Sequence, residues 1–153
     1  MEAPGDVTTR QVFAEDAAPG LEIPELVKRC TPRQLVMWAA ASGDFYEIHY
    51  DPDSARSAGL PGLVVHGALK HAFLGQLLHD WVAPGGRIVT FGCSYRGLDV
   101  PGEDLRCRGV VRRAYEQDGE HRVELEIWIE DPRGEVTTPG TAVVALPSRA
   151  GGG

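Results

Sequence analysis

The feature that most constrains the fold is a regular alternation of residue types near the end of the chain. Apolar side chains occupy every second position: Val123, Leu125, Ile127 and Ile129 alternate with Glu124, Glu126, Trp128 and Glu130. A period of two places successive side chains on opposite faces of a β-strand. One buried face and one largely solvated face are typical of an antiparallel sheet.

Further strands are predicted on both sides of this segment. Residues 87–96, 104–114 and 135–146 are strand candidates, together with 121–130, and a shorter strand is expected over 26–30. The residues between the four long candidates, at 99–102, 117–119 and 131–134, are rich in Asp, Pro and Gly and therefore favour turns. The second half of the chain is predicted to be a β-meander.

Two helices are predicted ahead of these four strands. Thr31 followed by proline is a strong helix start, because the hydroxyl can cap the first N–H groups and proline suits the first helical position. This helix covers 33–41 and ends at Gly43. A longer helix begins near residue 66 and runs to about Val82, with a broad apolar stripe that predicts burial. Between them, 51–56 should form a helical turn. The expected fold is α+β, with an antiparallel sheet wrapped around one central helix.

The length of 153 residues predicts a single domain. We expect an extended N-terminal arm over 1–20, the domain over 21–147 and a flexible tail over 148–153. A net charge of −7 argues against nucleic acid as a partner. The chain has no apolar run of membrane-spanning length and no signal peptide, so no membrane association and a cytoplasmic location are expected. Three cysteines without metal-ligand spacing are expected to be free thiols.

The chemically most informative segment runs from Ser42 to Pro52 and includes an acid, Asp44, and an imidazole, His49. A second short motif, His66-Gly67, opens the long helix. An acid and a histidine in a loop are usually structural when they occur alone, so their assignment depends on the surrounding motif. The other histidines of the long helix do not match the i, i+4 spacing of a zinc pair, and no metal site is predicted.

The complete pattern is Ser-Gly-Asp-x-x-x-x-His-x-Asp-Pro-x-x-Ala followed by Gly-Leu-Pro-Gly-Leu-Val-Val-His-Gly. It resembles the MaoC-like family of (R)-specific enoyl-thioester hydratases and dehydratases, and the resemblance extends over about residues 20–146. It implies a hotdog fold. It also implies that Asp44 and His49 hold a water against the β-carbon of a 2-enoyl thioester, while the backbone N–H of Gly67 binds the thioester carbonyl. Coenzyme A thioester would be the substrate, and no cofactor is implied.

The chain departs from this family at two positions, where Tyr46 and Glu47 replace the usual Asn and Pro. By lacking this Asn while keeping the Asp and the His, the chain resembles catalytic subunits of hydratases that act on bulky steroid side-chain thioesters. A large acyl group is therefore a hypothesis. Tyr46, His66 and Ser42 are the candidate substrate-binding residues. Arg112 and the arginine after it could bind a phosphate of the thioester carrier, although a solvated strand is the favoured interpretation.

Three other functions remain open. The first is a dehydratase subunit that acts on 3-hydroxyacyl-carrier-protein in lipid or polyketide synthesis. The second is a hotdog thioesterase, which would need an acid on the long helix, where only Asp80 is available. The third is a non-catalytic hotdog partner subunit. In each case we expect a homodimer, or a heterodimer or heterotetramer with a related hotdog subunit.

Overall fold

The computed structural model describes residues 10–151. Its helices and strands, in chain order, are β1 (Leu26–Arg29), α1 (Pro32–Ser42), α2 (Pro52–Ser57), α3 (Gly67–Val82), β2 (Arg87–Cys93), β3 (Asp104–Gln117), β4 (Glu120–Glu130) and β5 (Val136–Leu146). Three short 3-10 helices, η1 (Ala14–Asp16), η2 (Glu47–His49) and η3 (Arg149–Gly151), complete the list. The parts of the predicted arm and tail at 1–9 and 152–153 lie outside the described residues.

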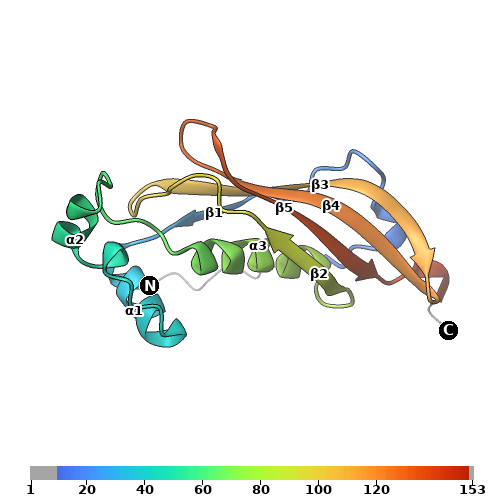
Figure 1. Ribbon diagram of the computed structural model, residues 1–153. Coiled ribbons are helices and arrows are strands. Elements are labelled where there is room, and N and C mark those ends of the chain that lie inside the picture. Colours follow the sequence, from blue (N-terminus) through green and yellow to red (C-terminus); the bar gives the residue numbers. More distant parts are fainter. Residues whose placement is uncertain (1–9, 152–153) are drawn as a thin grey trace, which may run out of the picture.

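The five strands form one antiparallel sheet in the order β1-β3-β4-β5-β2, which curls around α3 (Figure 1). The prediction of an antiparallel sheet wrapped around a central helix is therefore confirmed. β1, the last strand before α3, and β2, the first strand after it, lie at opposite edges of the sheet. The hairpin between β3 and β4 turns at Asp118 and Gly119, which both have positive φ (54° and 77°). That geometry is the tight two-residue turn for which Asp-Gly is suited.

The core lies between the sheet and α3. The predicted inward face of β4 is buried, with Val123, Leu125, Ile127 and Ile129 at most 2% exposed. Burial of each such side chain contributes about 1.5–3 kcal/mol. From α3, the buried apolar residues are Leu69, Phe73, Leu74, Leu77, Leu78 and Val82. The helix is thus held along its whole length, and its first residue is fixed relative to the sheet.

The outer face of the sheet is polar, as the alternation predicts. Arg113 lies opposite Glu124 in the β3–β4 register, and the two side chains form an ion pair at 2.6 Å. The neighbouring Arg112 pairs with Glu126 at 2.5 Å. Both arginines of the proposed phosphate site are therefore engaged by carboxylates, which favours the interpretation of a solvated strand.

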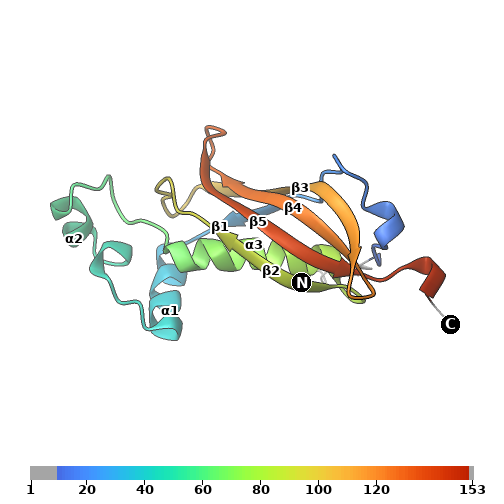
Figure 2. The same ribbon diagram turned by 45° about the vertical axis from the view of Figure 1, so that its right-hand side comes forward.

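The segment between β1 and α3 contributes no strand. It consists of α1, η2, α2 and their connections, and it lies beside the end of the sheet at which α3 begins (Figures 1 and 2). Within the described part of the chain, every helix is too short or too polar to cross a lipid bilayer.

Candidate active site

Asp44 is presented by the end of α1. Thr31 caps the helix by accepting a hydrogen bond from the backbone N–H of Gln34 at 3.2 Å, as predicted. The helix ends at Gly43, whose left-handed conformation (φ 78°) turns the chain away from the helix axis. The next side chain, Asp44, is half exposed, and its Oδ1 accepts a hydrogen bond from the N–H of Tyr46 at 3.3 Å. One carboxylate oxygen is thus tied to the loop and Oδ2 is directed elsewhere.

His49 is buried at the end of η2 and faces Asp44. Its Nδ1 lies 2.7 Å from the carbonyl oxygen of Val64. Because a carbonyl can only accept, Nδ1 must carry the proton of the neutral ring, and Nε2 is left as an acceptor. Nε2 lies 4.0 Å from Oδ2 of Asp44. That separation is too long for a direct hydrogen bond and suits one water that donates a hydrogen to each atom.

His66 lies directly against His49. The two imidazole rings are stacked, with centroids 3.7 Å apart and an interplanar angle of 20°. Nε2 of His66 lies 3.3 Å from the backbone carbonyl oxygen of Asp44, so it is the protonated nitrogen. Burial, and secondly the neighbouring His49, hold the pKa of His66 below its ordinary value. His66 is thus a neutral ring that connects the Asp44 loop to the start of α3.

Gly67 is the first residue of α3. The first N–H groups of a helix have no acceptor within the helix, and the helix dipole favours an anion at this end. The ring of Tyr95 lies directly over the α-carbon of Gly67: a Cβ built there would be only 2.9 Å from Cε2 of the tyrosine. A side chain at position 67 would therefore displace Tyr95. The predicted oxyanion donor is adjacent in sequence to the ring that stacks on His49.

The other predicted substrate-binding residues differ in their placement. The ring of Tyr46 meets His49 edge-on, with centroids 6.1 Å apart, and is 62% exposed, so it can contact a ligand at the pair. The hydroxyl of Ser42 instead donates to the carbonyl of Trp38 at 2.7 Å and accepts from the N–H of Asp44 at 3.3 Å. Ser42 therefore completes the end of α1 and supports Asp44.

The ligand atoms of Asp44, His49 and His66 lie within 4.8 Å of one another, so these three residues could hold a metal ion. The stacking of the two rings makes this arrangement unfavourable. The lone pair of an imidazole nitrogen lies in the ring plane, and two stacked rings place their lone pairs in nearly parallel planes about one ring thickness apart, so both cannot point directly at one ion. The geometry suits a bound water better than a metal.

Sequence reasoning missed two buried charged residues near this site. Lys70 is 2% exposed and Asp99 is 1% exposed, and they form an ion pair at 2.8 Å. A signal for Lys70 was present, because Lys70, Phe73, Leu74 and Leu77 follow the i, i+3, i+4, i+7 pattern of one helix face. A charge on the apolar face of a helix needs a buried partner. Asp99, 29 residues away in a loop, could not be identified as that partner from the sequence alone.

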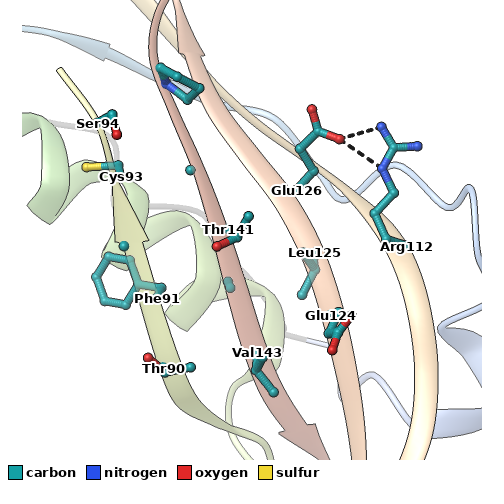
Figure 3. Close-up of a pocket in the computed structure, with 14 residues that line it drawn as sticks. Thr90, Phe91, Cys93, Ser94, Arg112, Glu124, Leu125, Glu126, Thr141 and Val143 are labelled. Atoms are coloured by element: carbon teal, nitrogen blue, oxygen red, sulfur yellow. Dashed lines mark hydrogen bonds and ion pairs between the residues drawn. The ribbon is translucent and has the colours of Figure 1, made fainter. Parts of the chain in front are cut away.

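A hollow of about 910 Å³ lies elsewhere, over β2, β5 and β4 on the side of the sheet away from α3 (Figure 3). Its lining includes the ion pair of Arg112 and Glu126, together with Thr141 and Val143. None of Asp44, His49, His66 or Gly67 lines it. The hollow is therefore separate from the candidate active site.

Comparison with known proteins identifies a family. The model of the MaoC-like domain matches residues 14–129. Among curated proteins, the chain is 35% identical over 107 residues to the fatty acid synthase beta subunit TOXC of Cochliobolus carbonum, covering 61% of this chain and 5% of that protein. It is 29% identical over 73 residues to the 3-oxo-4,17-pregnadiene-20-carboxyl-CoA hydratase beta subunit of Mycobacterium tuberculosis, covering 48% of this chain and 57% of that protein. The chain thus spans only part of each of these curated relatives.

Solved structures support the fold. The (R)-hydratase from A. caviae involved in PHA biosynthesis superposes with a TM-score of 0.76 at 24% identity, covering 85% of this chain and 97% of that one. The ChsH1-ChsH2 complex from Mycobacterium tuberculosis gives a TM-score of 0.73 at 21% identity, covering 84% of this chain and 98% of that one. At these identities the likeness shows the fold, and it confirms the predicted hotdog architecture.

Proposed function

Because the chain belongs to the family of MaoC-like dehydratase domains, we propose that it is an (R)-specific 2-enoyl-CoA hydratase and 3-hydroxyacyl-CoA dehydratase. The observation that carries this proposal is the 4.0 Å gap between Nε2 of His49 and Oδ2 of Asp44. Both atoms are hydrogen-bond acceptors, and the gap lies next to the start of α3. One water between them would direct both hydrogens to the pair and a lone pair outward.

The chemistry follows from this arrangement. The water oxygen adds to the β-carbon of the enoyl thioester while its proton passes to the Asp44–His49 pair. The electron pair of the double bond moves toward the thioester oxygen, where the N–H of Gly67 and the helix dipole stabilise the negative charge. The pair then returns a proton to the α-carbon, and the product is a 3-hydroxyacyl thioester. One such backbone donor is worth about 3 kcal/mol of barrier.

We further propose that the acyl group is bulky. Tyr46 replaces the Asn of the family pattern, and its exposed ring lies edge-on to His49, where it would line the acyl site. Of the similar proteins, the hydratase subunit from Mycobacterium tuberculosis acts, by its name, on a steroid-derived CoA thioester.

Two comparisons bear on the partner of the chain. The same relative is named as a beta subunit, and the ChsH1-ChsH2 structure is a complex. A related hotdog subunit is therefore the proposed alternative to a homodimer.

The test is to incubate the purified protein with 2-enoyl-CoA thioesters from short-chain to steroid-like and to follow the loss of conjugated enoyl absorbance. Hydration should occur in the wild type and be lost in His49→Gln, whereas His79→Gln, the same change at an exposed position on α3, should keep it. The absence of hydration with every thioester, alone and with a hotdog partner, would refute the proposal. Turnover that survives in a purified His49→Gln variant would refute the assigned site.

A second candidate is a dehydratase that acts on carrier-protein thioesters, and the similarity to a fatty acid synthase beta subunit favours it. Measuring kcat/KM for the same acyl group on coenzyme A and on a carrier protein separates the two functions, because the true substrate should give the higher value.

Thioesterase activity would appear as free thiol without hydration. Its candidate acid, Asp80, lies thirteen residues along α3 from Gly67, about 20 Å at the helical rise.

A further inference from the structure

The buried ion pair between Lys70 and Asp99 joins separate parts of the chain. Nζ of Lys70 donates to Oδ2 of Asp99 at 2.8 Å and to the carbonyl oxygen of Gly97 at 3.0 Å. Oδ2 also accepts from the hydroxyl of Thr137, on β5, at 2.8 Å. Three separate parts of the chain, α3, the loop after β2, and β5, therefore meet at one carboxylate oxygen.

Stability alone does not account for this pair. Removing two charges from water costs more than their attraction commonly returns, and apolar replacements of buried ion pairs are often neutral or stabilising. Oδ1 of Asp99 adds to the cost, because it is buried and has no hydrogen-bond partner among residues 10–151. The free-energy cost of the pair is instead explained if the geometry that it enforces serves the function of the site.

That geometry surrounds Gly67. On the N-terminal side, the backbone carbonyl of Asp99 accepts from the N–H of Val65 at 2.8 Å, two residues before Gly67. On the C-terminal side, Lys70 lies three residues after Gly67, within the first turn of α3. The loop that carries Asp99 also carries Tyr95, whose ring lies over Gly67 and 5.8 Å from Nζ of Lys70.

The same loop is attached to the sheet. The N–H groups of Arg96 and Gly97 both donate to the carbonyl of Thr137, at 2.9 and 3.0 Å. The start of α3 is consequently connected to the loop after β2, and through that loop to β5, by a backbone hydrogen bond before Gly67, an ion pair after it and the tyrosine ring above it.

We propose that Lys70 and Asp99 are positioning residues that hold the backbone N–H of Gly67, and Tyr95 above it, in the place where the thioester oxygen gains charge. The proposal rests on the proposed function for its catalytic consequence. Neither residue contacts substrate, since both are buried. A displacement of the donor by even 1 Å weakens an interaction made in the transition state more than it weakens substrate binding.

The main test is the double variant Lys70→Met/Asp99→Leu, which removes both charges together and so leaves neither one buried alone. We expect it to fold, with kcat at least about 10-fold lower and KM changed by less than about 3-fold. Backbone hydrogen exchange gives a second readout that needs no activity: protection of the Val65 N–H should fall at least about 10-fold, while that of β4 stays unchanged.

Thr137→Val is the milder variant if the double variant does not fold. It removes one hydrogen bond to Asp99 with little change of shape, and Thr138→Val makes the same change at a neighbouring, equally buried position. Thr137→Val should lower kcat and Val65 protection, whereas Thr137→Ser and Thr138→Val should keep both.

Unchanged kcat and unchanged Val65 protection in the double variant, or equal effects of the two valine variants, would overturn the positioning role. A wild type without hydratase activity would instead refute the proposed function, and hydrogen exchange would still decide whether the pair holds the start of α3.

Discussion

Replacement of Gly67 by alanine should lower activity and leave the fold intact. The loss of activity is expected because the new methyl group would collide with the ring of Tyr95. The new Cβ would lie 2.9, 3.0 and 3.1 Å from Cε2, Cδ2 and Cζ of the ring. Ordinary van der Waals contact begins at 3.4 Å, so the ring must retreat by about 0.5 Å from the nearest approach. The magnitude of the effect depends on whether the ring can move.

Two opposing effects on stability nearly cancel. Overpacking a closed core costs about 1–3 kcal/mol, but Tyr95 is 54% exposed and its ring can move toward solvent. Alanine is favoured over glycine by about 1 kcal/mol in a helix interior, and the gain is smaller at the first helical residue, where Gly67 lies. The free energy of unfolding of Gly67→Ala, measured by urea denaturation, should therefore lie within about 1 kcal/mol of the wild-type value.

The effect on catalysis should be much larger. The added methyl group and the displaced ring both crowd the N–H that is proposed to bind the thioester oxygen. Removal of an oxyanion donor costs about 10²–10³ in kcat, so partial obstruction should lower kcat/KM by up to about 10²-fold. The assay is the hydration of a 2-enoyl-CoA thioester that the wild type turns over.

The Tyr95→Ala background separates the ring from the methyl group. Without the ring, Gly67→Ala has room, and its loss of activity should be clearly smaller than in the wild-type background. Tyr95→Phe, which keeps the ring and loses only the hydroxyl, serves as the control and should behave like the wild type. An equal loss in the Ala and wild-type backgrounds, or a fully active Gly67→Ala enzyme, would refute the reasoning.

Three further predictions concern other parts of the molecule. Asp44→Asn should lower kcat by about 10²–10⁴-fold. Its combination with His49→Gln should be no slower than the slower single variant, because both residues are proposed to act on one water. Steady-state kinetics, with Asp53→Asn as an exposed control, decides this, and additive losses would exclude a shared water. The free energy of unfolding should decrease as the pH falls below about 6.5, because the pKa of His66 is lower in the folded than in the unfolded chain and the unfolded chain binds the proton first. Urea titrations between about pH 5 and about pH 8 measure this slope, which should flatten in His66→Gln; an identical slope in that variant would contradict the assignment. Burial raises the pKa of the Cys107 thiol to about 12, so a disulfide reagent at about pH 8 should leave this thiol unmodified in the native protein and react with it in urea, as peptide mass analysis would show.

The arrangement of the sheet was largely predictable from local patterns. The alternation at 123–129 identified the buried face of β4, and Asp118-Gly119 identified the tight turn before it. These features are encoded by neighbours in sequence, because strand periodicity and turn conformation are local properties. The ends of the strands were less accurate: β2 ends at Cys93 instead of residue 96, where Arg96 and Gly97 leave the ladder to bond the carbonyl of Thr137.

The candidate site was predictable only in part. Asp44 and His49 could be paired through the motif, and the structure places them 4.0 Å apart. The stacking of His66 on His49 was not predictable, because it depends on how the α1–α2 segment folds back on the start of α3. The position of Tyr95 over Gly67 was not predictable either, because it depends on how the loop after β2 packs on the start of α3. No local pattern near residue 95 indicates that contact.

The segment between β1 and α3 supplies the acid, the imidazole and the exposed Tyr46, and it contributes nothing to the hydrogen-bonded ladder of the sheet. The proposed oxyanion donor, Gly67, belongs instead to the helix at the centre of the fold. Evolution can therefore alter the two halves of the site separately. Substitutions, insertions or a neighbouring subunit at the α1–α2 segment can reshape the space proposed for the acyl group, while the sheet and α3 keep their register and the proposed binding point of the thioester stays in place.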